Sequence, residues 1–457
     1  MTSTTADYDL VGVGIGPFNL GLAALAEPLA DLRTLFLDAR PQFHWHPGLL
    51  LDSARLQVPF LADLVCLVDP TSRWSFLSYL REHDRLFPFY FAERFHVPRR
   101  EYDHYCRWVA RSLPSCRFAS LVDGVGWDAG SARFRVDVTD QATGTTSRVT
   151  ARNVVLGVGT EPVVPDALAP LLGAEIFHAG DYLHRLPDLA GARDITVIGS
   201  GQSGAEVVLD LLRRAPDHGW RLRWLTRSPA FAPMEYSKLG LEHFTPDHTR
   251  YFRDLPAATR DRLVGQQWQL YKAISAETIA EIHDLLYERS VGGGQPELTM
   301  AANVDIRAAH RVGASYLLDC HQTRQERSFR VRTDRVVLAT GYAARRPDLL
   351  DPLAHLIDVD ADGRYRVDGD YRVAVDPTVT GGLYVQNAEL HTHGVGTPDL
   401  GLGAWRSATI LNAVTGRTAY RLPARTAYTT FGVPADAEPV PTAPATPALE
   451  QSHVVRH

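Results

Sequence analysis

The sequence predicts an α/β fold that contains two Rossmann-like domains and a small helical insert. Two apolar segments, residues 8–11 and 195–198, each run into a glycine-rich loop. A helix pattern and a second apolar strand follow each loop, which is the order of a βαβ unit. They are expected at 19–26 and 34–37 in the first unit, and at 205–214 and 222–226 in the second. The length of the chain also favours two domains, because 457 residues are more than one hydrophobic core usually holds.

Composition and charge exclude several classes of protein. Hydrophobic residues make up 45% and charged residues 22% of the chain, as in globular proteins. The net charge of -6 gives no basic surface for nucleic acid. No run reaches the roughly 18 apolar residues of a membrane span. The N-terminal residues lack the basic-then-apolar layout of a signal peptide, so we expect a cytoplasmic location.

Cysteine and histidine patterns argue against a metal site. The four cysteines, at positions 66, 106, 116 and 320, form no CxxC motif. Histidines recur at 44–46 and 391–393, but no cluster of carboxylates or thiols accompanies them. We therefore expect no metal, and cysteines that pack as small apolar side chains.

The first glycine-rich loop predicts a bound dinucleotide. In such a loop the first glycine makes the strand-to-helix turn and the second admits the pyrophosphate, which then faces the helix N-terminus. The third glycine allows close helix packing. This loop has Gly12, Gly14 and Gly16, with Pro17 where the third glycine of the pattern usually stands. Asp38 ends the next strand, where a carboxylate can accept hydrogen bonds from a ribose.

The second loop has the complete glycine pattern and predicts a nicotinamide cofactor. The following strand ends at Arg227 and Ser228 instead of an acidic residue. An arginine suits a 2′-phosphate, whereas a carboxylate would repel it, so NADPH is favoured over NADH. The residues of this loop that we expect at the cofactor are Gly199, Gly201, Gln202, Ser203 and Gly204.

Several further motifs carry a resemblance to a known family. They are residues 14–20 (GIGPFNL), 43–48 (FHWHPG), 56–64 (LQVPFLADL), 199–204, 339–342 (ATGY), and 393–394 leading to 404–407 (AWRS). Together, over roughly residues 8–420, they resemble the flavin-dependent N-hydroxylating monooxygenases of siderophore biosynthesis, the lysine, ornithine and diamine N-monooxygenases. The resemblance is closest to the cadaverine and putrescine N-hydroxylases.

The resemblance implies an activity, two cofactors and an assembly. FAD would be reduced by NADPH and would form a C4a-hydroperoxyflavin with O2. One oxygen atom would pass to a primary amine, giving a hydroxylamine for hydroxamate siderophores. The partners are therefore a small aliphatic amine and O2, and the expected assembly is a homo-oligomer, usually a tetramer. Residues near the flavin would be Trp45 and Gln57 as catalytic residues, and His46, Thr340, Gly341, Tyr342 and Leu400 as cofactor contacts.

The expected domain order follows from this assignment. The FAD-binding domain has parts at 1–165 and 331–425, and the NADPH-binding domain has parts at 166–234 and 304–330. A helical substrate-binding insert occupies 235–303, with a long, polar-faced helix at 259–288. Residues 426–457 are expected to be a disordered tail, because Pro and Ala dominate it from position 434.

The substrate pocket favours a diamine over an amino acid. The amino-acid enzymes carry a lysine in the motif FLKDL, where this chain has Ala62. The positions of further carboxylate partners align with Leu241 and Gly401. Burying an α-carboxylate without a partner costs several kcal/mol, so cadaverine or putrescine is expected, with L-lysine N6- or L-ornithine N5-hydroxylation as the alternative.

A diamine also needs a counter-charge for its second ammonium. The acidic candidates are Glu242, Asp399 and Glu389, each of which is otherwise read as a solvated carboxylate. Lys238 offers a different outcome, because it could replace the missing lysine and favour an amino acid. The reacting nitrogen must be a free base, although an alkylamine of pKa about 10.4 is mostly charged at pH 7. The site must therefore favour deprotonation.

Three other classes share parts of this pattern. A Baeyer–Villiger or S-oxygenating flavin monooxygenase would show FxGxxxHxxxW, but the segment at 177–182 (FHAGDY) lacks a glycine and a histidine at the positions that this motif requires. A disulfide reductase would need a close cysteine pair after the first loop. A non-catalytic flavin redox sensor would not need the intact second loop, and amine-stimulated NADPH oxidation would distinguish it.

Overall fold

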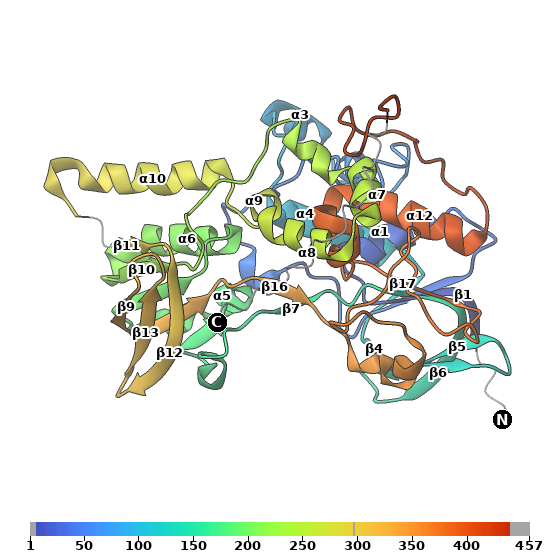
Figure 1. The fold of residues 1–457 in the computed structure, drawn as a ribbon, viewed down its shortest axis with the longest axis horizontal. Coiled ribbons are helices and arrows are strands. Elements are labelled where there is room, and N and C mark those ends of the chain that lie inside the picture. Colours follow the sequence, from blue (N-terminus) through green and yellow to red (C-terminus); the bar gives the residue numbers. More distant parts are fainter. Residues whose placement is uncertain (1–5, 296–297, 439–457) are drawn as a thin grey trace, which may run out of the picture.

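The computed structural model describes residues 6–295 and 298–438, which form two sheet-containing units lying side by side (Figure 1). The strands of the first unit are β1 (Ala6–Val13), β2 (Thr34–Leu37), β3 (Cys116–Arg117), β4 (Ser120–Asp128), β5 (Arg133–Asp140), β6 (Thr146–Leu156) and β17 (Gly382–Val385). They form a seven-stranded sheet in the order β3-β2-β1-β6-β5-β4, with β17 paired to β6. β1 runs parallel to β2 and β6, whereas β4, β5 and β6 form an antiparallel meander.

Both faces of this first sheet are covered. The helices of the unit are α1 (Pro17–Ala26), α2 (Phe76–Glu82), α3 (Leu86–Ala92), α4 (Arg99–Ser112), α11 (Leu390–His393) and α12 (Gly403–Thr415). Leu10 of β1 shares a core with Leu22 of α1 and Leu411 of α12. Val11 packs in a separate core on the opposite face. Because successive side chains of a strand alternate between faces, the apolar run of β1 contributes to both cores.

The second unit is a parallel sheet of five strands in the order β11-β10-β9-β15-β8. The strands are β8 (Ile176–His178), β9 (Asp194–Ile198), β10 (Arg221–Leu225), β11 (Leu298–Ala301) and β15 (Arg335–Leu338). Ile195 and Val197 pack against α6 (Gln202–His218). Ile198 instead packs towards a three-stranded antiparallel sheet of β12 (Val304–Val312), β13 (Ser315–Gln322) and β14 (Arg327–Thr333).

A narrow two-stranded ribbon connects the units. It consists of β7 (Thr160–Pro162) and β16 (Tyr342–Ala344), which pair antiparallel between the two sheets in Figure 1. The hydroxyl of Thr340 donates to the carbonyl of Val163, and Val163 N donates to Gly341 O at 2.9 Å. The turn at 340–342 therefore does return the chain towards the first unit. The short helix α5 (Tyr182–Arg185) follows β8.

The predicted long helix at 259–288 is wrong. The insert contains four helices, α7 (Pro246–Asp254), α8 (Ala257–Gln266), α9 (Trp268–Tyr271) and α10 (Ala276–Ser290). Residues 272–275 form an irregular segment because Ile274 pairs with the strand-like residues 232–234: Ile274 N donates to Ala232 O and Met234 N donates to Ile274 O. Ser275 then caps α10 by accepting from Thr278 N. Long-range backbone pairing interrupts the helical pattern here.

Two expected domain boundaries need to move. Residue 331 lies inside β14, and β15 pairs with β8 and β9 of the second sheet. At the other end of the insert, β11 pairs in parallel with β10. We therefore propose that the insert ends before β11, and that the chain leaves the second unit after β15, not at 331.

The part of the tail that is described is ordered against the insert, which corrects the expectation of disorder from residue 426. Thr426 N and Ala427 N donate to the carboxylate of Asp247, the latter at 2.9 Å. The ring of Phe431 lies 4.9 Å from that of His248, edge to face. The rest of the predicted tail, 439–457, lies outside the described residues.

Two features are absent from residues 6–295 and 298–438. None of their helices is both long and apolar enough to cross a lipid bilayer. Within the same residues, no group of three or more His, Cys, Asp or Glu side chains is placed to hold a metal ion.

Candidate active site

Both glycine-rich loops open onto one cavity of about 2530 Å³. A single small-ligand site usually measures roughly 300–1,000 Å³, so this cavity has room for two dinucleotides and a small substrate. It runs between the two units and reaches the insert. The expected site residues that line it are Gly14, Gly16, Pro17, Asp38, Trp45, His46, Gln57, Ala62, Gly199, Gly201, Gln202, Ser203, Arg227, Leu241, Thr340, Gly341, Tyr342, Asp399, Leu400 and Gly401.

The first loop fits a pyrophosphate. Gly14 has a φ of 84°, and a Cβ there would lie 2.4 Å from the carbonyl oxygen of Gly157. Gly16 faces open space directly before the N-terminus of α1. Pro17 is the first residue of that helix, where no backbone N–H is needed. The close-packing glycine is Gly21, whose Cβ would lie 2.9 Å from Leu64 O. The loop can therefore do without a glycine at position 17.

Gly12 and Asp38 serve this loop in different ways. Gly12 does not line the cavity, because it faces the ring of Phe36. A Cβ on Gly12 would lie 2.2 Å from an atom of that ring. Asp38 Oδ2 accepts a hydrogen bond from Ile15 N at 2.8 Å, and Arg40 forms an ion pair with the same oxygen at 2.7 Å. Burial opposes ionisation, but these hydrogen bonds outweigh it and lower the pKa of Asp38. Arg40 also lines the cavity and was missed by the sequence analysis.

The second loop has the geometry that its glycines predict. Gly199 has a φ of 117°, and a Cβ there would lie 2.1 Å from Ala339 O. Gly204 lies against Gly199, with 2.3 Å between its hypothetical Cβ and the carbonyl oxygen. Gly201 directly precedes α6, whose N-terminus faces the cavity. Arg227 lies beyond the end of β10 on the same wall, exposed to the cavity.

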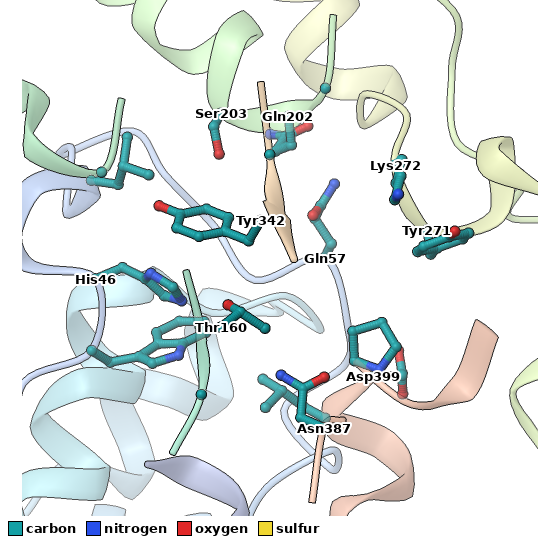
Figure 2. Close-up of a pocket in the computed structure, with 18 of the residues that line it drawn as sticks. His46, Gln57, Thr160, Gln202, Ser203, Tyr271, Lys272, Tyr342, Asn387 and Asp399 are labelled. Carbon is teal, nitrogen blue, oxygen red and sulfur yellow. The ribbon is translucent and has the colours of Figure 1, made fainter. Parts of the chain in front are cut away.

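The rings of His46 and Tyr342 lie near each other on the side of Ser203 of the second loop (Figure 2). The ring centroids of Trp45 and His46 are 5.2 Å apart, and those of His46 and Tyr342 are 6.0 Å apart. Although His46 faces the cavity, burial by the surrounding protein and the charges of Arg99 and Arg40 lower its pKa to about 4. The imidazole is therefore neutral at pH 7 and adds no positive charge to this wall.

Gln57 points from the same wall towards the insert. Its side-chain Nε2 lies 2.9 Å from the sulfur of Met234, and its backbone carbonyl oxygen accepts from the hydroxyl of Tyr236 at 3.0 Å. Figure 2 places Gln57 between Tyr342 and Asp399. It therefore lies where the first unit's part of the cavity meets the segment that leads into the insert.

Three of the expected substrate residues, Ala62, Asp399 and Gly401, lie together in the wall of the cavity. Ala62 is 5% exposed, and a Cβ added to Gly401 would lie 3.9 Å from the Cβ of Ala62. Asp399 Oδ1 accepts from Gly401 N at 2.7 Å. Burial raises the pKa of Asp399 to about 6, although this hydrogen bond and the charge of Arg406 oppose the change. This part of the cavity wall therefore combines a carboxylate with two small residues.

Two of the acidic candidates do not reach the cavity. The carboxylate of Glu242 accepts from Tyr428 N at 2.9 Å and Thr429 N at 2.8 Å. Glu389 is fully buried and forms an ion pair with Arg406 at 2.8 Å. Neither lines the cavity, because each carboxylate is held by partners within the protein. Asp399 remains as the candidate that does.

Some cavity residues gave no signal in the sequence. Lys272 follows α9 in the irregular segment before α10, and its Nζ lies 5.1 Å from the ring centre of Tyr271. Asn387, Tyr236 and Arg99 also line the cavity. None belongs to a motif with a fixed spacing, so only the fold brings them together.

The fold and the cavity define a protein that binds two dinucleotides beside a small pocket with a carboxylate. The chain belongs to the L-lysine 6-monooxygenase/L-ornithine 5-monooxygenase family, whose model matches residues 6–344. This confirms the resemblance seen in the motifs.

Relatives match almost the whole chain. The rhizobactin siderophore biosynthesis protein RhbE of Rhizobium meliloti is 45% identical, over 94% of this chain and 96% of its own. The putrescine N-hydroxylase of Shewanella oneidensis is 43% identical, over 93% and 84%. Among solved structures, the FAD-bound cadaverine monooxygenase DfoA of Erwinia amylovora superimposes with a TM-score of 0.91 at 40% identity, covering 95% of this chain and 100% of that one.

Proposed function

We propose that the protein is an FAD- and NADPH-dependent N-hydroxylase of a small aliphatic diamine, such as putrescine or cadaverine, and that its product supplies a hydroxamate siderophore. The substrate assignment rests on one observation. The small residues Ala62 and Gly401 lie beside the carboxylate of Asp399 in the wall of the cavity. The relatives named for putrescine, cadaverine and siderophore synthesis support it.

The protein's own groups would hold the two cofactors. The N-terminus of α1 and the open space at Gly16 would receive the pyrophosphate of FAD. The N-terminus of α6 would receive that of NADPH, with Arg227 on its 2′-phosphate. When bound, the cofactor pair supplies reducing equivalents and an oxygen atom derived from O2.

The remaining residues shape the place where the oxygen is transferred. Trp45 and Tyr342 form aromatic walls that reduce the access of water. Because the imidazole of His46 is neutral at pH 7, it adds no acidic imidazolium proton to the site. Gln57 has an amide within the cavity, close to the path between the flavin side and Asp399.

Asp399 would bind the ammonium that does not react. With one end of the diamine held as a cation, the other end extends towards the flavin side, where low polarity favours the free amine. An α-carboxylate in this place would face Asp399 and would meet no cation at Ala62. This selects against amino acids by charge repulsion and by loss of a partner.

L-Lysine is the second candidate, and one observation favours it. Lys238 and Lys272 both line the cavity, so a carboxylate could find a cation on the insert. The decisive experiment is hydroxylamine formation with cadaverine, putrescine, L-lysine and L-ornithine in parallel. We expect the diamines to have the higher kcat/KM; a higher value for L-lysine would overturn the substrate assignment.

The assembly and location are part of the same proposal. We propose a homotetramer in the cytoplasm, as the resemblance to the family implies. Light scattering of the FAD-loaded protein measures the oligomeric state, and fractionation of cells measures the location. A monomeric mass at the concentrations of the assay would contradict the tetramer.

A further inference from the structure

A series of hydrogen-bonded polar side chains joins the second glycine-rich loop to the first unit and to the insert. Arg99 begins α4 in the first unit, and its Nη1 lies 2.8 Å from Glu206 Oε2 on α6. Glu206 Oε1 accepts from Gln202 Nε2 at 2.9 Å, one turn earlier on α6. Gln202 in turn reaches the start of α10 in the insert. These three side chains thus link the first unit, the second unit and the insert at the N-terminus of α6.

The amide of Gln202 makes three hydrogen bonds within the protein. Besides its bond to Glu206, its Oε1 accepts from Ser275 N at 2.8 Å and its Nε2 also donates to Thr278 Oγ1 at 3.0 Å. Ser275 is the N-cap of α10 and accepts from Thr278 N. An amide nitrogen has two N–H donors, and both are used here. The side chain of Gln202 therefore has no N–H left to donate to a cofactor.

The contact between Arg99 and Glu206 is also protected from water. The two side chains are 12% and 4% exposed. Burial raises the pKa of Glu206, and the charge of Arg99 opposes this change. Buried charge-assisted hydrogen bonds have short distances and fixed directions, so this pair defines how α6 sits against α4.

We propose that Arg99, Glu206 and Gln202 are positioning residues that fix the nicotinamide-binding loop relative to the flavin-binding unit and the insert. The inference rests on the proposed function, because it concerns hydride transfer between two bound cofactors. Such transfer depends steeply on geometry, and a displacement of about 1 Å can cost around a hundredfold in rate. The three residues act through α6 and do not need to touch either cofactor.

Anaerobic reduction of the FAD-loaded protein by NADPH, followed at the flavin absorbance, tests this role. In Gln202→Met and in the double variant Arg99→Met/Glu206→Met, we expect the limiting rate of flavin reduction to fall about tenfold or more. The NADPH concentration at half-maximal rate should change less than about threefold, since the loop itself is intact. The double variant avoids leaving a lone buried charge, which a single substitution would do.

Arg213→Met provides a matched control. Arg213 and Glu281 form an ion pair at 2.6 Å that also joins α6 to the insert helix α10, but both side chains are about half exposed. Loss of this exposed ion pair should leave the limiting rate of flavin reduction unchanged.

Normal flavin reduction in both Gln202→Met and the double variant would overturn the inference. Weaker NADPH binding with an unchanged limiting rate would also overturn it, because Gln202 would then be a direct ligand. The assay contains no amine, so the identity of the substrate does not affect it. Failure of the unsubstituted protein to be reduced by NADPH would instead contradict the proposed function.

Discussion

Arg406 Nη1 lies 2.8 Å from Glu389 Oε1, and the two side chains are 1% and 0% exposed. Arg406 also donates to Thr397 O at 2.6 Å and lies over the ring of Phe18, 4.5 Å from its centre. The pair therefore supports the turn that leads to Asp399 from behind. Because Glu389 is paired there, we expect Asp399, the other acidic residue of this turn and one that lines the cavity, to supply the counter-charge for a diamine.

Arg406→Met should destabilise the protein strongly. It leaves Glu389 buried and unpaired, which usually costs about 3–5 kcal/mol. We expect a clear drop in the denaturant midpoint of the FAD-loaded protein. The double variant Arg406→Met/Glu389→Met should recover much of the loss, since no lone charge remains. Equal midpoints for the single and double variants would show that the pair is not the cause.

Asp399→Asn should weaken the binding of a diamine. A hydrogen bond to a charged group contributes about 1.5–3 kcal/mol, so we expect KM for the preferred diamine to rise about ten- to a hundredfold. KM for NADPH and the FAD content should not change. Steady-state hydroxylamine formation measures the effect, and an unchanged KM for the amine would exclude Asp399 as its partner.

The pH dependence of amine binding should follow Asp399. Its pKa is raised to about 6, so below pH 6 the carboxyl group is neutral and cannot pair with an ammonium. The ratio of KM for the diamine in Asp399→Asn to that in the unsubstituted protein should therefore be close to one at pH 5, rise as the pH passes about 6, and level off above 7. The free-base requirement of the reacting nitrogen, with a pKa of about 10.4, changes KM with pH equally in both proteins and cancels from this ratio.

Ala62→Lys should reduce activity on diamines. The new ammonium would lie beside Gly401 and Asp399, where it repels a cationic substrate and competes for its carboxylate. We expect KM for cadaverine to rise at least about tenfold. Ala62→Met is the control, because it adds a chain of similar length without charge. If both variants fail equally, size and not charge controls the pocket.

Arg227→Ala should reduce the preference for NADPH. Loss of a charge-assisted contact to a phosphate costs about 1.5–3 kcal/mol, so KM for NADPH should rise about tenfold or more while that for NADH changes little. Arg221→Ala is a suitable control, since Arg221 begins the same strand and pairs with Asp194. Equal losses with both nicotinamide cofactors would contradict the assignment of the 2′-phosphate.

The parts of the site that follow from local sequence were predictable. A strand, a glycine turn and a helix lie within about ten residues of each other, so Gly14 and Gly199 could be assigned from the chain alone. The positions of Ala62 and Gly401 within one pocket came from the resemblance, not from spacing. Their closeness in the structure depends on contacts across more than three hundred residues.

The errors share a physical cause, which is pairing between distant segments. The carboxylate of Glu242 meets the backbone of Tyr428 and Thr429, so no pattern around Glu242 reveals that it is occupied. The break before α10 arises because Ile274 pairs with Ala232. Likewise, β15 looks like any short apolar strand, and only its partners β8 and β9 assign it to the second unit.

The ordered segment at 426–431 makes the C-terminal end of the described chain a part of the amine pocket's support. Its backbone amides satisfy Glu242 and Asp247, on either side of the start of α7, and Leu241 of the pocket directly precedes Glu242. Shortening the protein to end before Thr426 would therefore strip both carboxylates of these donors and loosen the insert. Turnover of the amine would suffer although every residue lining the cavity were still present.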